Sequence, residues 1–284
     1  MRLYIKKKIN LILSMFIFII IFIGEKKIES SIYSKGLDNI NYTKKIPILA
    51  FHRIVPDDLK KKFFRRNRYV GSLKIFNEMI KYIFKSGYKT ISSEEFYEWY
   101  IGKVQYDNKT LLITLDDGHY EDYYLVYPII KKYNLKATSF VIGSKIKEKT
   151  APYYKYNDSY IGLDSINKVR EDYPFFEFQS HSFNMHYNSK IYNGKFEHRI
   201  KTMSYEEIKN DTLNNKKYGF ITMAYPYGAY NKDIKKILLS QGYLVAFKFG
   251  HSAYAIRKND RFAIPRISIN GNAKLGTLKK WLNY

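Results

Sequence analysis

The feature that most constrains the fold is an apolar run, residues 111–115, which leads directly into Asp116, Asp117 and Gly118. The run is short and rich in β-forming residues, and it predicts a buried strand. Two neighbouring carboxylates repel each other, and removing both from water is costly unless they share a cation or a proton. If one carboxylate bound a metal and the other were free to accept a proton, both the repulsion and the desolvation cost would be reduced. Gly118 would permit a sharp exit, although a surface Asp-Asp-Gly turn is also common.

Two later segments carry further polar groups. Residues 176–186 contain His181 and His186, and residues 221–228 end in Tyr-Pro-Tyr-Gly. On a helix, five residues turn by about 500°, so the two histidine side chains would diverge. On a strand, an odd separation places them on opposite faces. The two rings can therefore converge only if the segment after Gln179 is a loop.

Strands and helices are expected to alternate along the chain. Apolar periodicity predicts strands over 46–51, 110–115, 137–142, 175–179, 221–225, 243–249 and 262–269. It predicts helices over 72–85, 92–100, 120–133, 204–217, 233–240 and 275–282, with capping boxes at Ser92/Glu95 and Ser204/Glu207. Pro128 marks a kink in the third helix. The alternation predicts a mostly parallel sheet, either open and doubly wound or closed into a barrel.

In order and spacing, these segments resemble the NodB-homology polysaccharide deacetylases, carbohydrate esterase family 4. The five-residue histidine spacing and an early Phe51-His52-Arg53-Ile54 stretch resemble the branch that N-deacetylates poly-β-1,6-N-acetylglucosamine, a biofilm exopolysaccharide. The resemblance covers the chain from about Ile46 to the C-terminus. It implies an α/β fold, a distorted (β/α) barrel of about seven strands. In barrels the site lies at the C-terminal strand ends, where these candidate residues fall.

The resemblance implies that Asp117, His181 and His186 bind a divalent metal. Two neutral imidazoles and one carboxylate leave positions open for water and substrate, as a catalytic metal requires. Zn²⁺ is the first expectation, and Co²⁺, Ni²⁺ or Fe²⁺ suit the same ligands. Two unrelated surface histidines are the alternative. Asn184 stands where this branch often has an acidic residue, so that position has no expected role here.

The resemblance also assigns catalytic roles for hydrolysis of an N-acetyl amide. Asp116 is the expected general base. The backbone N–H of Tyr227 is the expected oxyanion donor, because Pro226 has no N–H. The alternative is that the Tyr-Pro-Tyr-Gly turn only ends a strand and has no catalytic role.

Two further assignments follow from the resemblance. His52 is expected to protonate the leaving amine as the general acid. Ala224 occupies the position where the wider family has an arginine that braces the base, and Arg266 is the expected substitute. An ordinary strand-end salt bridge is the alternative for Arg266. The remaining histidines that we assign to the surface are His119 and His198.

Composition limits the partners. The chain has 49 lysines and arginines against 26 acidic residues, a net charge of +23, and no cysteine. Disulfides and thiolate chemistry are therefore excluded. No nucleic-acid-binding motif is present, so we expect no nucleic-acid partner and attribute the charge to a biased composition or to an anionic membrane or cell-wall surface. The basic, aromatic run 60–69 is expected to be an exposed loop that suits an anionic lipid surface.

The N-terminus resembles an export signal. Basic residues precede an apolar core at 9–23, which is shorter than the roughly 20 residues of a membrane span. We expect residues 1–24 to be a signal peptide or membrane anchor, 25–44 a linker and 45–284 the deacetylase domain. The basic flank predicts an exported protein on the extracellular face of the membrane or cell wall.

Three other functions remain open from the sequence. The same chemistry on β-1,4-linked peptidoglycan or chitin-like chains is the first. An inactive surface carbohydrate-binding module is the second, and a basic membrane-adhesion protein is the third. The intact set of candidate side chains argues against the second, and the third predicts that the charge matters and the metal does not.

Overall fold

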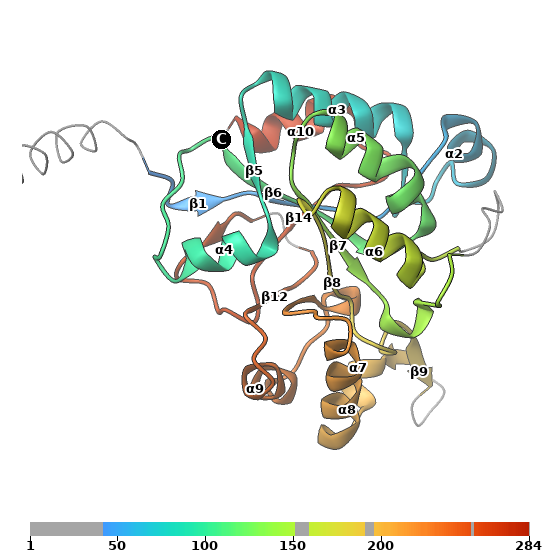
Figure 1. Ribbon diagram of the computed structural model, residues 1–284, viewed down its shortest axis with the longest axis vertical. Coiled ribbons are helices and arrows are strands. Elements are labelled where there is room, and N and C mark those ends of the chain that lie inside the picture. The colour runs from blue at the N-terminus through green and yellow to red at the C-terminus, as the bar shows by residue number, and fades with distance from the viewer. Residues whose placement is uncertain (1–41, 151–158, 191–195, 251–252, 284) are drawn as a thin grey trace, which may run out of the picture. The chain divides into compact units, whose positions relative to one another are not determined.

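The computed structural model describes residues 42–150, 159–190, 196–250 and 253–283. The proposed signal or anchor, residues 1–24, and nearly all of the proposed linker lie outside the described residues. A parallel sheet in the order β12-β11-β8-β7-β6-β2-β14, with β5 also paired to β6, forms the centre of the fold (Figure 1). Its strands are β2 (Ile48–Phe51), β5 (Lys89–Ile91), β6 (Thr110–Asp117), β7 (Ala137–Val141), β8 (Phe176–Ser180), β11 (Thr222–Ala224), β12 (Val245–Phe247) and β14 (Ile267–Ser268).

Strand β6 is the longest strand and the centre of the sheet. Its middle, Leu112 to Leu115, pairs with β2 along one edge. The opposite edge pairs first with β5 and then, from Thr114 to Asp117, with β7. All of β6 except Asp117 is buried, as expected for a strand that is covered on both faces.

The sheet curls until its two ends meet. Phe247 of β12 forms an isolated parallel bridge with Ile264, and the Lys248 N–H donates to the Ile264 carbonyl at 2.9 Å. Three residues later the same segment pairs with β2 through Ile267 and Leu49. Seven strands therefore form the distorted barrel that the family resemblance implied, with β5 outside the ring.

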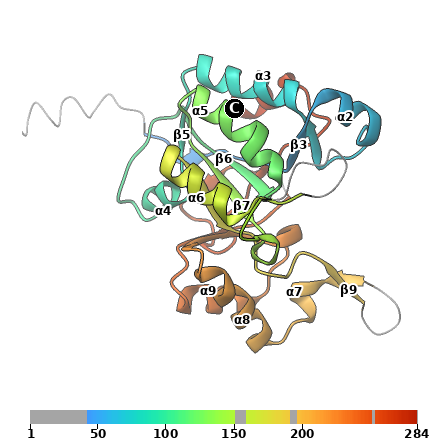
Figure 2. The ribbon, with the colours of Figure 1, turned by 45° about the vertical axis from the view of Figure 1, so that its right-hand side comes forward.

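The helices are α2 (Asp57–Phe63), α3 (Leu73–Lys85), α4 (Ser93–Tyr100), α5 (Tyr127–Lys132), α6 (Leu163–Asp172), α7 (Arg199–Thr202), α8 (Tyr205–Lys216), α9 (Lys232–Ser240) and α10 (Leu275–Leu282). Helices α3, α5 and α10 gather at one end of the sheet, whereas α7, α8 and α9 gather at the other (Figure 2). Both predicted capping boxes are present, at the starts of α4 and α8. Short strands pair outside the main sheet: β1 (Lys45–Ile46) with β13 (Ala255–Ile256), β3 (Arg53–Val55) with β4 (Val70–Ser72), and β9 (Asn188–Lys190) with β10 (Phe196–His198).

One sequence-based expectation was wrong. The run 60–69 is not a plain exposed loop, because its start belongs to α2. Lys60 is buried, and its ammonium group donates to the carbonyls of Phe64 and Asn67. The helix expected over 120–133 is present as a continuous helical run from Tyr120 to Lys132, in which the turn η1 (Asp122–Val126) is π-helical and leads into α5. Pro128 lies just after this π-helical turn, so the irregularity falls where the sequence places it.

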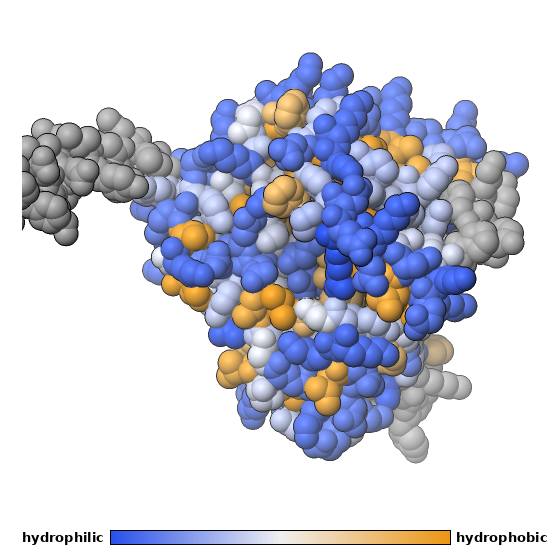
Figure 3. Space-filling view, in the orientation of Figure 1, coloured by the Kyte–Doolittle hydropathy of each residue, from blue (hydrophilic) through white to orange (hydrophobic). Residues whose placement is uncertain are grey.

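The surface is mostly hydrophilic, with hydrophobic side chains in scattered patches on the face that Figure 3 shows. Across the described ranges, none of the helices has the length and hydropathy needed to cross a membrane.

Candidate active site

The two carboxylates stand at the C-terminal end of β6, inside the strand rather than after it. Asp116 is 1% exposed, and Asp117 adopts a left-handed conformation with φ 82°, which aspartate tolerates better than most residues. Gly118 follows at φ 69°, and a Cβ there would lie 2.0 Å from Val141 Cγ1. This close approach to β7 explains why glycine ends the motif.

Asp117, His181 and His186 form a cluster of potential metal ligands. One donor atom from each lies within 4.8 Å of the others. The Nε2 atoms of His186 and His181 lie 3.0 and 3.4 Å from Asp117 Oδ1, yet Oδ1 has no hydrogen-bond partner of suitable geometry. Ligands at about 2.0–2.1 Å in a tetrahedral site stand about 3.3 Å apart. The donor set therefore fits a divalent ion such as Zn²⁺.

The backbone of a neighbouring strand orients His181. Its Nδ1 lies 2.8 Å from the carbonyl oxygen of Ala224, at the end of β11. Because a carbonyl can only accept, Nδ1 carries the proton and Nε2 keeps its lone pair toward Asp117. Despite burial, which acts to raise it, the contacts with His119, His181 and His186 hold the pKa of Asp117 well below its ordinary value.

The segment between the two histidines is a loop, as their spacing requires, and Asp211 on α8 fixes its shape. The Asp211 carboxylate accepts the N–H groups of Phe183 and Asn184, both at 2.7 Å. Ser182 adopts a left-handed conformation with φ 65°, and its hydroxyl accepts the N–H of Met185. The Asp211 carboxylate and the Ser182 hydroxyl therefore both shape the loop that leads to His186.

Replacing Asp211 with alanine is expected to weaken Zn²⁺ binding about 10–100-fold, the range usual for groups that orient metal ligands. The loop would lose both of its hydrogen bonds to α8, and His186 would lose its fixed position. Competition with a chromogenic chelator measures the affinity. Glu206→Ala is the matched control, because Glu206 lies on the same helix and its side chain is exposed. Equal affinity in the two variants would contradict this role.

Asp116 forms a buried ion pair with Arg266. The guanidinium Nη1 and Nη2 atoms each lie 2.7 Å from a different carboxylate oxygen, and Nη1 also donates to the Thr114 hydroxyl at 3.1 Å. Arg266 has no exposed surface. Burial acts to raise the pKa of Asp116, but Arg266, with His181 and His52, holds it below its ordinary value. Asp116 is therefore ionised at neutral pH and suited to accept a proton.

Replacing Arg266 with methionine is expected to lower the free energy of unfolding by about 3–5 kcal/mol, because Asp116 would be left as an unpaired buried charge. Urea unfolding at neutral pH measures the change. Arg65→Met, at an exposed position, is the control and is expected to lie within about 0.5 kcal/mol of the wild type. A loss at Arg266 no larger than in the control would show that the pair contributes little.

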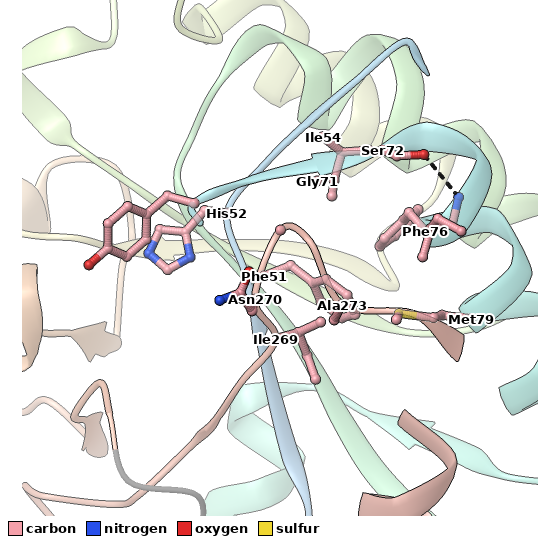
Figure 4. Close-up of a pocket in the computed structure, with 13 residues that line it drawn as sticks. Phe51, His52, Ile54, Gly71, Ser72, Phe76, Met79, Ile269, Asn270 and Ala273 are labelled. Carbon is pink, nitrogen blue, oxygen red and sulfur yellow. Dashed lines mark hydrogen bonds between the residues drawn. The ribbon is translucent and has the colours of Figure 1, made fainter. Parts of the chain in front are cut away.

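His52 follows β2 and faces the same carboxylate. Its Nε2 lies 3.9 Å from Asp116 Oδ2. The ring also lines a pocket together with apolar side chains, among them Ile54, Phe76 and Ile269 (Figure 4). Burial lowers the pKa of His52, and the charges of Asp116 and Asp117 oppose this only in part.

Tyr227 lies in the turn after β11 and adopts a left-handed conformation with φ 59° and ψ 7°. Gly228 follows at φ 68°, and a Cβ there would lie 2.6 Å from backbone atoms of Phe249. Within the described residues, the Tyr227 N–H makes no hydrogen bond. It is thus free to bind an oxygen from outside the chain.

The assignment of His119 to the surface was wrong. His119 is buried, stacks on Tyr160, and its Nε2 lies 3.5 Å from Asp117 Oδ2. Its position directly after Gly118 was the signal in the sequence. His198 is half-buried and stacks on Tyr227, but it belongs to a short hairpin that the sequence does not reveal.

One cavity of about 320 Å³ joins most of these groups. Its lining consists of His52, Tyr69, Asp116, Asp117, His181, His186, His198, Tyr227 and Phe249. Arg266 does not line the cavity, but it forms the buried ion pair with Asp116. Tyr69, which we had placed in an exposed loop, therefore contributes to the site. The arrangement combines a potential metal site, an ionised carboxylate, an imidazole and a free N–H within one pocket.

Two relatives with assigned functions cover about three quarters of the chain. A poly-β-1,6-N-acetyl-D-glucosamine N-deacetylase of Staphylococcus aureus is 28% identical over 220 residues, 75% of this chain and 72% of the relative. The corresponding enzyme of Staphylococcus epidermidis is 26% identical over 211 residues, 72% of this chain and 70% of the relative.

Solved structures share the fold. The Streptococcus pyogenes deacetylase PplD superposes with a TM-score of 0.69 at 22% identity, covering 84% of this chain and 98% of that one. IcaB from Ammonifex degensii superposes with a TM-score of 0.65 at 19% identity, covering 85% and 98%.

The sequence model of the polysaccharide deacetylase family matches residues 103–246, which is 144 of the 284 residues. That range includes both aspartates, both metal-site histidines and the Tyr227 turn. The chain therefore belongs to the polysaccharide deacetylase family.

Proposed function

We propose that this deacetylase removes N-acetyl groups from poly-β-1,6-N-acetylglucosamine, a biofilm exopolysaccharide, by metal-dependent hydrolysis. The observation that carries the chemistry is that Asp116, Asp117 and the His181–His186 pair meet in one cavity. The substrate of the two staphylococcal relatives, poly-β-1,6-N-acetyl-D-glucosamine, supports this choice of substrate. A divalent ion at Asp117, His181 and His186, with Zn²⁺ as the first choice, would polarise the acetyl carbonyl and lower the pKa of a water.

The residues around the cavity then have distinct roles. Asp116 takes one proton from the attacking water, whose oxygen forms the new bond to the acetyl carbon. The Tyr227 N–H donates to the oxygen that becomes negative as the carbonyl opens. His52 delivers a proton to the nitrogen as the C–N bond breaks. His52 Nε2 lies 3.9 Å from Asp116 Oδ2, a separation at which the proton that the base has taken returns to His52 through one water. The products are acetate and a free amine.

The test is amine release by the metal-loaded, full-length protein from β-1,6-linked and β-1,4-linked N-acetylglucosamine oligomers. Release from the β-1,6 series in clear preference to the β-1,4 series is expected. Preference for the β-1,4 series would support the proposed deacetylation chemistry but contradict the proposed β-1,6-linked substrate. No release from either would contradict the proposed function.

We also propose that the enzyme acts outside the cell, at an anionic membrane or cell-wall surface. The basic N-terminus with its apolar core supports export. Lys61, Lys62, Arg65 and Arg66 are exposed around α2, and Phe63 is 46% exposed between them. Such a mixture suits an anionic interface. Sedimentation with phosphatidylglycerol vesicles, but not with phosphatidylcholine vesicles, would support the surface, and equal sedimentation would contradict it.

A further inference from the structure

The hairpin β9–β10 brings His198 to the rim of the catalytic cavity. In the hairpin register, His198 pairs with Asn188. The two side chains also meet, with His198 Nδ1 2.8 Å from the Asn188 side-chain oxygen. The backbone pairing and the side-chain bond together fix the plane of the imidazole. His198 is therefore held in place from within the hairpin.

The His198 ring stacks on Tyr227. It lies nearly parallel to the Tyr227 ring, with centroids 4.6 Å apart and an interplanar angle of 10°. The His186 ring also contacts Tyr227, with centroids 4.6 Å apart and a tilt of 32°. Tyr227 therefore contacts both a potential metal ligand and His198. Aromatic pairs of this kind contribute favourable energy beyond their buried area.

The backbone of Tyr227 needs such support. A left-handed conformation is unfavourable for a residue other than glycine, and it persists only where the surroundings hold it. The N–H of Tyr227 has no partner in the described part of the chain, and the residue is 40% exposed. The ring contacts with His198 and His186 are therefore a source of support for this conformation.

We propose that His198 is a positioning residue for deacetylation: by stacking on Tyr227 it holds the turn that presents the Tyr227 N–H to the acetyl oxygen. The inference rests on the proposed oxyanion role of Tyr227. His198 acts through Tyr227 and needs no contact of its own with the reacting atoms. An interaction that matters only in the transition state changes kcat rather than KM.

The test compares His198→Ala with His198→Phe. Alanine removes the stack, whereas phenylalanine keeps an aromatic ring and removes both ring nitrogens. With acetate release from an N-acetylglucosamine oligomer as the assay, we expect His198→Ala to lower kcat about tenfold and to change KM less than about twofold. His198→Phe is expected to restore at least half of the lost kcat.

Controls separate this inference from the proposed function. Tyr187→Ala removes an exposed ring that precedes the same hairpin but lies outside the cavity lining, and it is expected to retain the wild-type kcat. Zn²⁺ affinity, measured for every variant, should stay within about threefold of the wild type.

The outcomes are distinct. A wild type inactive on all oligomers contradicts the proposed function itself. An active wild type with an unchanged His198→Ala kcat overturns the positioning role alone. A raised KM that phenylalanine does not rescue also overturns it, because the imidazole would then bind the sugar directly.

Discussion

Asp116→Asn is expected to reduce deacetylation by about 10²–10⁴-fold while Zn²⁺ still binds. An amide cannot take the proton that the carboxylate accepts, and general base catalysis is typically worth this much. Asp117, His181 and His186 form the donor cluster, and Asp116 is not one of its members. Acetate release and chelator competition on the same preparation measure the two quantities.

The same substitution leaves the Arg266 cation without its charged partner. Destabilisation is therefore a competing reason for inactivity. The double variant Asp116→Asn with Arg266→Met removes the unpaired charge and is expected to unfold at a higher urea concentration than the single variant, yet to stay inactive. Recovery of activity in the double variant would show that Asp116 is not the base.

Loss of a metal-site histidine is expected to have an effect of similar size. His181→Ala should lower Zn²⁺ affinity by at least about 100-fold, more than the loss of an orienting group, and acetate release should fall with it. His181 is buried, and the Ala224 carbonyl holds its Nδ1. We therefore expect no neighbouring side chain to take over its role as a metal ligand.

Thermal unfolding gives a readout that does not depend on turnover. Zn²⁺ at 100 times its dissociation constant stabilises the folded state by about 2.7 kcal/mol, so the wild type should melt at a higher temperature when loaded. His181→Ala should show no such shift at the same Zn²⁺ concentration. His119→Asn is a useful comparison, because His119 contacts only the other oxygen of Asp117. A variant of His181 that keeps the full shift would contradict its place among the ligands.

Local patterns could predict most of the fold. Strand β6 was expected from its apolar run, and the capping boxes at the starts of α4 and α8 are present. Helix α6 was not predicted, since its buried apolar side chains are few and include Ile166 and Val169. The hairpin β9–β10 was not predicted either, because three-residue strands are too short to show an alternating pattern.

The site also contains residues that the sequence predicts and residues that it does not. Asp116, Asp117, His181 and His52 each follow or end a strand, so a parallel sheet brings them to one edge whatever the details of packing. Asp211 and His198 act through contacts that depend on how α8 and a hairpin pack against the barrel. No sequence spacing encodes the pairing of Asp211 with Phe183 and Asn184, which lie 28 and 27 residues away.

Because Asp211 on α8 is hydrogen-bonded to the histidine loop, the stability of α8 contributes to the binding free energy of the ion. If α8 opens locally, the loop loses both bonds, and with them the position of His186. The affinity for the ion is therefore set by the free energy of that local opening as well as by the donor atoms. By linkage, a bound ion suppresses the opening and slows amide hydrogen exchange along α8, although no residue of that helix is among the three ligands.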